Sequence, residues 1–144
     1  MLVDTAGSGN RAATVAMTSA DAILVPALAG EADLTEAENT VRLAGGLARA
    51  ARREIPVRVL LNRVKRAHLA RHAAKELAEA GLPRLEASLS DLVAYGELCF
   101  SGRVPRAGAA AAELSSLVAE LRGLGFVPGR AARRGRSARK NVSA

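Results

Sequence analysis

The chain has 144 residues and a formal net charge of +7; 49% of its residues are apolar but 2% are aromatic. This length allows one domain with a modest core. The apolar runs are much shorter than the roughly 20 residues that cross a bilayer, which excludes a transmembrane helix. One cysteine, Cys99, excludes an internal disulfide, and no signal-peptide pattern is present. We therefore expect a cytoplasmic protein.

The chain opens on a short apolar stretch that ends in an acid, Asp4, followed by Thr5-Ala6-Gly7. We expect residues 2–4 to form a strand, with the Asp4 carboxylate at the carboxyl edge of a parallel sheet, where nucleotides bind. There Asp4 would hold Mg²⁺ or order the attacking water, and Gly7 would let a backbone N–H approach a phosphate. The alternative is an Asp that only ends a strand and begins a turn.

The rest of the chain alternates strand and helix patterns. The expected strands cover residues 22–26, 57–62 and 85–88. The expected helices cover residues 11–19, 35–53, 67–80, 91–99 and 109–123. Strands that alternate with helices of about ten or more residues predict right-handed crossovers and a mostly parallel sheet with helices on both faces, an α/β fold.

Particular residues predict where these elements end. Pro26 should stop the second strand at the edge of the sheet. Thr35 and Glu38 match the capping box that opens a helix. Gly81 should close the helix over 67–80 in the left-handed conformation, and Ser90 should cap the helix over 91–99.

The charge divides the chain into a domain, residues 1–127, and a tail, residues 128–144. The tail contains no acid. Its basic residues are Arg130, Arg133, Arg134, Arg136, Arg139 and Lys140. Without these six charges the domain is close to neutral. Because the tail has too little apolar area to bury, we expect it to be disordered.

Four segments occur in an order and spacing typical of one family. They are residues 2–7, 19–26, 59–64 and 88–105. Together they resemble the ParA/MinD family of deviant Walker-A P-loop ATPases, especially the ParA-like plasmid and chromosome partition proteins. The resemblance covers roughly residues 1–124, so the fold it implies is the C-terminal part of a P-loop NTPase domain.

The resemblance implies roles for individual residues. Asp4 matches the acid after the Walker B-type strand, which serves the metal and the water. Thr5 and Gly7 match the switch region that senses the γ-phosphate. Asn62 matches an Asn that hydrogen-bonds adenine, a role that suits an amide because it offers both a donor and an acceptor; on spacing alone, a turn former at a strand end is an equal alternative. Pro105 lies in a segment that resembles the adenine side of the pocket.

The activity implied is ATP hydrolysis in DNA segregation. In the family, ATP with Mg²⁺ drives a homodimer that binds DNA without sequence preference, and hydrolysis, stimulated by a partition partner protein, releases it. A MinD-like membrane cycle is disfavoured, because the Arg/Gly/Ser/Ala tail lacks bulky apolar residues.

One element of the family pattern is missing. No Gly-x-x-x-x-Gly-Lys occurs in the 144 residues, and Gly7-Ser8-Gly9 follows the acid with no lysine after it. Because this loop cradles and neutralises the phosphates, we expect no competent hydrolysis by this chain alone. The first strand is also short, which favours a fragment or a late start codon.

The basic residues suggest an alternative function. Residues that could form a patch facing DNA phosphates are Arg52, Arg53, Arg63, Lys65, Arg66 and Arg71. Together with the basic tail they would make a non-catalytic, nucleoid-associated DNA-binding or adaptor protein with steeply salt-dependent affinity. The other interpretation of these residues is an ordinary solvated surface.

Two further residue patterns have plain interpretations. His68 and His72 are four residues apart on a helix, a spacing that can hold a metal, but Arg71 beside them would oppose a cation. We expect a solvated helix face there. Cys99 has no neighbouring His or Cys, so we expect a small buried apolar residue.

Overall fold

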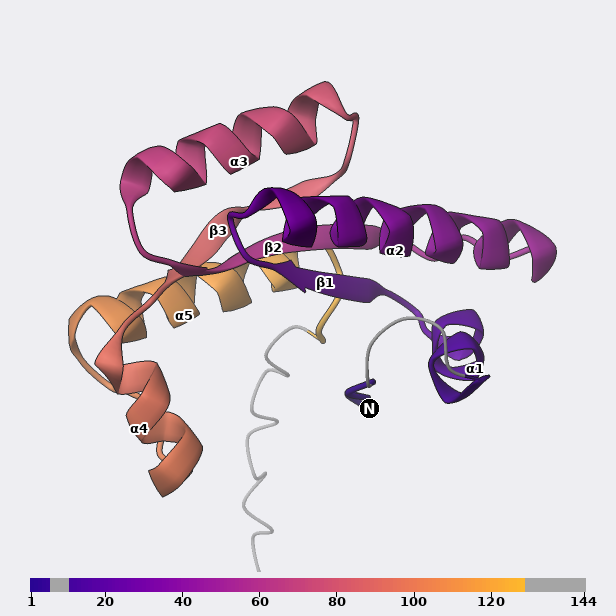
Figure 1. Cartoon of the computed structure of the whole chain (residues 1–144). Helices are drawn as coiled ribbons and strands as arrows, with labels where there is room; N and C mark the ends of the chain where they lie inside the picture. Colours follow the sequence, from indigo (N-terminus) through magenta and orange to yellow (C-terminus); the bar gives the residue numbers. More distant parts are fainter. Residues whose placement is uncertain (6–10, 129–144) are drawn as a thin grey trace, which may run out of the picture.

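A computed structural model describes residues 1–5 and 11–128 of the chain. The described part folds into a three-stranded sheet with helices around it (Figure 1). In chain order the elements are α1 (Arg11–Ser19), β1 (Ile23–Ala27), α2 (Glu31–Ala50), β2 (Val57–Val64), α3 (Ala67–Glu79), β3 (Arg84–Ser90), α4 (Val93–Ser101) and α5 (Gly108–Gly123).

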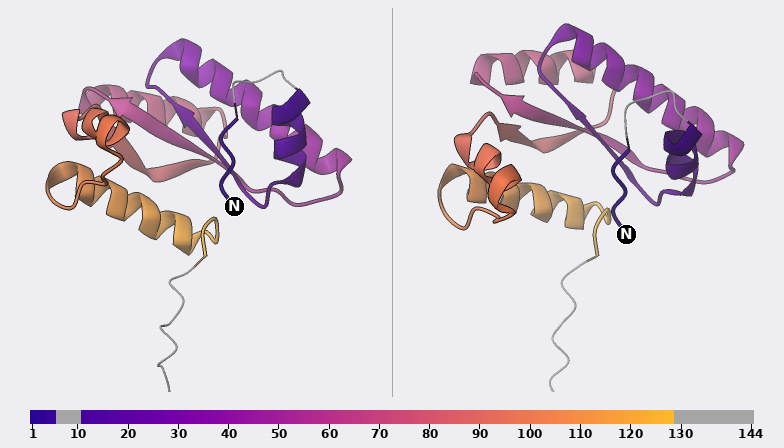
Figure 2. Two further views of the ribbon diagram at one scale, coloured as in Figure 1. Left: turned by 90° about the horizontal axis from the view of Figure 1, so that it is seen from below. Right: turned by 60° about the horizontal axis from the view of Figure 1, so that its bottom comes forward.

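The sheet is parallel throughout, with the order β1-β2-β3. All three strands therefore end at the same edge, and β2 is the central strand. The helices α2 and α3 lie on one face and α5 lies on the other (Figure 2). The α/β fold with helices on both faces of a parallel sheet is thus confirmed.

Each face of the sheet has its own apolar core. Beneath α2 and α3, Val59 and Leu77 are almost completely buried, as are the small residues Ala44 and Ala73 that let these helices approach the sheet closely. Beneath α5 the core is smaller and consists mainly of Leu60, Leu85 and Leu117. A fully buried Leu or Val contributes about 1.5–3 kcal/mol relative to its exposed state, so the larger core dominates the stability of the fold.

Pro26 does not stop β1, as the sequence led us to expect; the strand continues to Ala27. The Ile23 N–H donates to the Pro56 carbonyl of the loop before β2 (2.9 Å), so the backbone groups of alternate residues face β2. The backbone groups of Leu24 and Pro26 consequently face the unpaired edge of β1. The missing N–H of Pro26 therefore costs no ladder hydrogen bond, which is why proline is tolerated in an edge strand.

Two predicted helix starts are wrong. α2 begins at Glu31 after Gly30, four residues before Thr35, and no side-chain hydrogen bond caps it. Its buried stripe begins at Leu34, so packing on the sheet extends the helix past the local capping signal. Likewise α4 begins after Leu92, because the Ser90 hydroxyl is used elsewhere.

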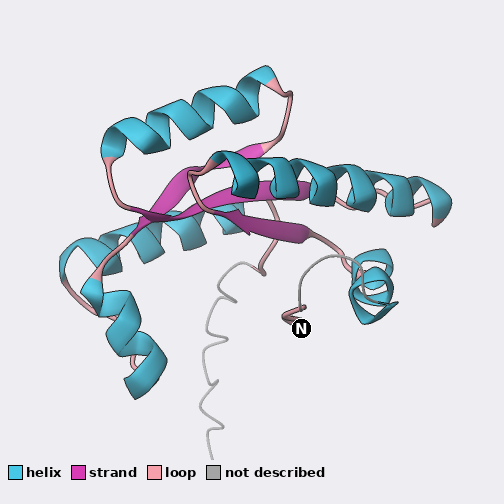
Figure 3. Cartoon of the chain, in the orientation of Figure 1, coloured by secondary structure: helices cyan, strands magenta, loops and turns pink. Residues whose placement is uncertain are grey.

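The predicted strand over residues 2–4 does not form. Residues 1–5 belong to no strand and are drawn as a loop in Figure 3. Met1 and Leu2 are almost fully exposed, and Val3 is 52% exposed. Such a short apolar stretch buries too little surface to offset the entropy of ordering it beside a strand whose edge is weakened by Pro26.

Candidate functional site

The carboxyl edge of the sheet receives two of the predicted site residues. Asn62 is half-buried near the end of the central strand β2, and Pro105 is half-buried in the loop between α4 and α5. Because α4 leaves the end of β3 and α5 returns along the sheet in the opposite direction, their connecting loop lies on the side where the strands end (Figure 1). Ligands of open parallel α/β sheets bind at this edge.

The backbone just after Asn62 has an uncommon conformation. Arg63 has φ = 51°, in the left-handed region, and its N–H donates to Oδ1 of Asn62 (2.9 Å). The Arg63 Nε in turn lies 3.4 Å from Oδ1 of Asp91. A non-glycine residue in this conformation costs on the order of 1–2 kcal/mol, and such strain clusters at functional sites. The hydrogen bond fixes the plane of the Asn62 amide at the edge of the sheet.

The structure does not bring Asp4 and Thr5 to this edge. Both are exposed and belong to no strand. In Figures 1 and 2 the N-terminus lies toward the amino ends of the strands, away from the edge that carries Asn62. The expected position of Asp4 at the end of a central strand is therefore wrong. Gly7 lies outside the described residues.

Sequence analysis missed a polar stripe on α5. The face of α5 that packs on the sheet carries Glu113, Leu117 and Glu120, at helical spacing. Leu117 fills the core, while each glutamate accepts hydrogen bonds from the outer edge of β3. The signal in the sequence was an acid one turn before and one turn after a buried leucine. An amphipathic stripe predicts an apolar residue at each of these places.

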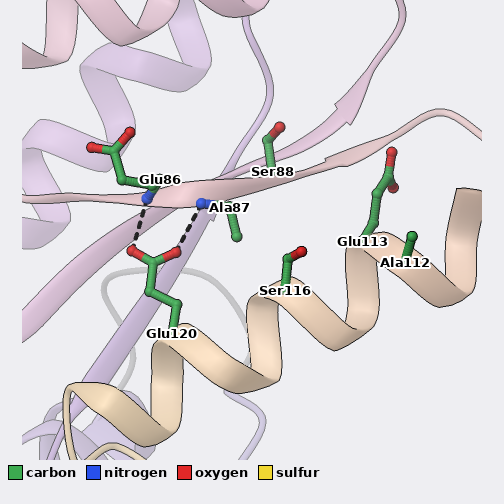
Figure 4. A pocket seen from close by; sticks show the side chains of 7 residues that line it. All are labelled: Glu86, Ala87, Ser88, Ala112, Glu113, Ser116 and Glu120. Carbon is green, nitrogen blue, oxygen red and sulfur yellow. Dashed lines mark hydrogen bonds between the residues drawn. The ribbon is translucent and has the colours of Figure 1, made fainter.

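Glu120 binds an irregular part of β3. Its two carboxylate oxygens accept the N–H groups of Glu86 and Ala87, each at 2.8 Å (Figure 4). These donors are available because the register between β2 and β3 shifts here: Leu61 pairs with Ser88, whereas Val59 pairs with Arg84. The carboxylate thus satisfies two backbone groups that the sheet leaves unpaired.

Glu113 joins three elements. Its carboxylate accepts the Ser90 N–H (3.0 Å), the Ser90 hydroxyl (2.6 Å) and the Tyr95 hydroxyl (2.8 Å). Partial burial alone raises the pKa of Glu113, but these three hydrogen bonds outweigh it, and the net pKa is lowered. Burial, followed by the hydrogen bond to Glu113 and its negative charge, raises the pKa of Tyr95 to about 12. At neutral pH the pair is therefore a carboxylate and a neutral phenol.

A shallow hollow lies between β3 and α5, between the two glutamates. It is lined by Ser88, Ser116, Glu86 and the two glutamates, together with Ala87 and Ala112 (Figure 4). None of the predicted site residues lines it. The Glu113 and Glu120 carboxylates at its two ends already accept hydrogen bonds from β3 and α4.

The predicted basic patch is divided between two ends of the molecule. Arg52 and Arg53 follow α2, which runs about 30 Å from the carboxyl edge back to the amino ends of the strands. Arg53 is also engaged there, since it donates to the Thr18 carbonyl (2.8 Å). The remaining four lie at or after the carboxyl end of β2: Arg63 is in the strand, Lys65 and Arg66 are in the loop after it, and Arg71 is on α3. No single surface presents all six.

The histidine prediction agrees with the structure and the cysteine prediction does not. His68 and His72 are exposed on α3, and Nε2 of His72 lies 2.9 Å from Oε1 of Glu76. Cys99 is exposed rather than buried. Within residues 1–5 and 11–128, no three His, Cys, Asp or Glu side chains gather as metal ligands, and no helix is long and apolar enough to span a bilayer.

Comparisons of the chain with family models, with curated proteins and with solved structures give no match. The function must therefore be inferred from the geometry described above and from the resemblance of the sequence motifs.

Proposed function

We propose that this chain is the adenine-binding part of a ParA-like partition ATPase. The observation that carries the proposal is the position of Asn62: it lies near the end of the central strand of a parallel sheet, with its amide held by the strained backbone of Arg63. The amide can donate to a base through Nδ2 and accept through the second lone pair of Oδ1, because the Arg63 N–H uses only one of the two lone pairs. Pro105, on the returning loop, supplies an apolar surface on the same side of the sheet.

The residues suit the adenine base of a Mg²⁺–ATP complex better than they suit its metal ion and phosphates. Asn62 and Pro105 suit the base. In the described part of the chain no acidic cluster suits Mg²⁺, and Asp4 is isolated from the edge. The roles of Asp4, Thr5 and Gly7 toward metal and phosphate remain predictions from the resemblance. Since the sequence has no lysine-containing phosphate loop, the proposal for this chain is recognition of the base without hydrolysis.

The test is a titration of the full chain with ATP, followed by chemical shifts of the backbone amides. We expect weak binding, because the phosphates lack their cradle, and loss of most of that binding in Asn62→Ala. Asn39→Ala is the matched control, since Asn39 is exposed on α2. Equal affinities of the wild type and Asn62→Ala would refute the assignment of the base site. An ATPase rate that Asp4→Ala abolishes would refute the absence of hydrolysis.

A second candidate function is non-specific DNA binding at the same edge. Exposed basic residues lie near the end of β2 and in the loops after β2 and α4: Arg63, Lys65, Arg66, Arg103 and Arg106. The test is duplex DNA binding across a series of salt concentrations. Replacing both Lys65 and Arg66 by Ala should reduce the salt slope by about 2 if both contact phosphates. An unchanged slope would exclude this edge as a DNA-binding surface.

A further inference from the structure

The helix α4 is attached to the domain in an unusual way. None of its residues is buried, although its composition is largely apolar. Val93 is 80% exposed and Phe100 is 95% exposed. A helix that is apolar all round is normally buried, so apolar packing on the sheet does not explain why α4 keeps its position.

Hydrogen bonds through Tyr95 provide the attachment. Its hydroxyl donates to the Glu113 carboxylate at 2.8 Å, and the Ala110 carbonyl of α5 lies 3.4 Å from the same oxygen. Among the residues that the structure describes, these are the hydrogen bonds by which an α4 side chain reaches another element. Glu113 is held in turn by the hydroxyl and the N–H of Ser90, at the end of β3.

The same attachment determines where the loop after α4 runs. α4 is capped at its C-terminal end by Gly102, which has the left-handed conformation (φ = 65°) and whose N–H donates to the Leu98 carbonyl (2.8 Å). Residues 102–107 then cross to α5, which carries Glu113 in its second turn. Both ends of this loop are consequently fixed relative to each other by the contact between Tyr95 and Glu113.

We propose that Ser90, Tyr95 and Glu113 form a latch that positions α4 and the 102–107 loop, including Pro105, beside the carboxyl edge of the sheet. In this proposal, which rests on the adenine site proposed above, the three are positioning residues for base recognition. Opening the latch frees α4 without unfolding the sheet, because α4 contributes nothing to either apolar core.

The experiment compares three variants of the full chain by amide hydrogen exchange. Tyr95→Phe removes one hydroxyl and keeps the ring. Glu113→Ala removes the shared acceptor. Glu120→Ala is the matched control, because Glu120 also binds β3 from α5 but does not contact Tyr95.

The latch predicts exchange that accelerates in one region. In Tyr95→Phe, residues 93–107 should exchange roughly three- to tenfold faster, the range expected from one hydrogen bond. Exchange in β2 should not change. In Glu120→Ala, exchange in α4 should accelerate relative to the wild type by no more than exchange in β2 does. Unchanged exchange over 93–107 in Tyr95→Phe, or uniform acceleration through the chain, would refute the latch.

Binding of ATP to the same variants separates this proposal from the adenine site. If Tyr95→Phe opens α4 and weakens ATP binding in parallel, the positioning role is supported. If α4 opens and ATP affinity is unchanged, the positioning role is refuted. If the wild type binds no ATP while exchange responds as predicted, the latch stands and the adenine site fails.

Discussion

At the scale of single residues, the contact between Tyr95 and Glu113 can be followed directly, because Tyr95 is the one tyrosine of the chain and there is no tryptophan. An absorbance titration should give a phenol pKa of about 12 in the intact protein. In Glu113→Ala the pKa of Tyr95 should fall, since both the hydrogen bond and the negative charge are removed, but it should stay above the ordinary value because burial, the largest cause of the shift, remains. A wild-type pKa near 10 in the folded protein would show that the contact does not form.

The lowered pKa of Glu113 also predicts how stability depends on pH. A carboxyl whose pKa is lower in the folded state binds fewer protons there than in the unfolded chain. Its contribution is therefore fully present above the ordinary carboxyl pKa and is lost as the pH falls through the folded value.

Urea unfolding of the wild type and Glu113→Gln at a series of pH values measures this contribution. The stability difference between the two proteins should be constant near neutral pH and should shrink below about pH 4. The neighbouring Asp91 is present in both proteins, so its contribution cancels in the difference. A difference that persists unchanged at low pH would contradict the ionised state of Glu113.

At the scale of elements, α2 shows packing overriding a local signal. Thr35 lies in the second turn of the helix rather than before its first. Thr35→Ala should therefore change the free energy of unfolding by at most about 0.5 kcal/mol, because alanine has the higher helix propensity and no cap is lost. Thermal or urea unfolding of the wild type and Thr35→Ala measures this change in the free energy of unfolding. A loss of about 1 kcal/mol or more would indicate that Thr35 acts as the cap.

Unlike Thr35→Ala in α2, removal of the Glu120 side chain of α5 should clearly destabilise the protein, because Glu120 contacts β3. Glu120→Ala leaves the N–H groups of Glu86 and Ala87 without their acceptor, and Ala87 is partly buried. We expect a loss of about 1–3 kcal/mol in urea unfolding. Ser115→Ala is the control, since its exposed hydroxyl bonds only within α5. Equal stabilities of the two variants would show that Glu120 does not protect the edge.

Element boundaries that depend on nearby residues could be predicted from the sequence. Boundaries that depend on contacts with other elements could not. The α3 boundary depends on Gly81, whose left-handed conformation (φ = 67°) closes the helix as expected. The start of α2 and the course of β1 past Pro26 depend on contacts with other elements. The acids of α5 were missed for the same reason: nothing near Glu113 or Glu120 in the sequence indicates that β3 presents unpaired N–H groups to them.

At the scale of the whole molecule, the residues of the expected nucleotide site lie in two separate places. Asn62 and Pro105 lie at the carboxyl edge that the alternation of strands and helices predicted. Asp4 and Thr5 do not, because residues 2–4 form no strand. The Asp4-Thr5 motif predicted binding of metal and phosphate at the end of a strand. A strand forms only when it pairs with a neighbouring strand, and the motif carries no information about that pairing.

The two cores should also respond separately to mutation. Leu77 on the α3 face and Leu85 on the α5 face are both 1% exposed. Either Leu→Ala change should cost about 2–5 kcal/mol in urea unfolding. Hydrogen exchange of α5 should accelerate more in Leu85→Ala than in Leu77→Ala, and α3 should show the reverse. Identical exchange patterns in the two variants would mean that the layers do not open independently.

The proposed function and the positioning role of the proposed latch both depend on recognition of a base at the carboxyl edge of the sheet. The most direct measurement is a map of backbone amide shifts in the full chain during a titration with adenosine, which has no phosphate. We expect perturbations concentrated in residues 60–66 and 102–107, with guanosine causing smaller ones. Shifts spread over the amino ends of the strands, or no shifts at millimolar adenosine, would contradict it.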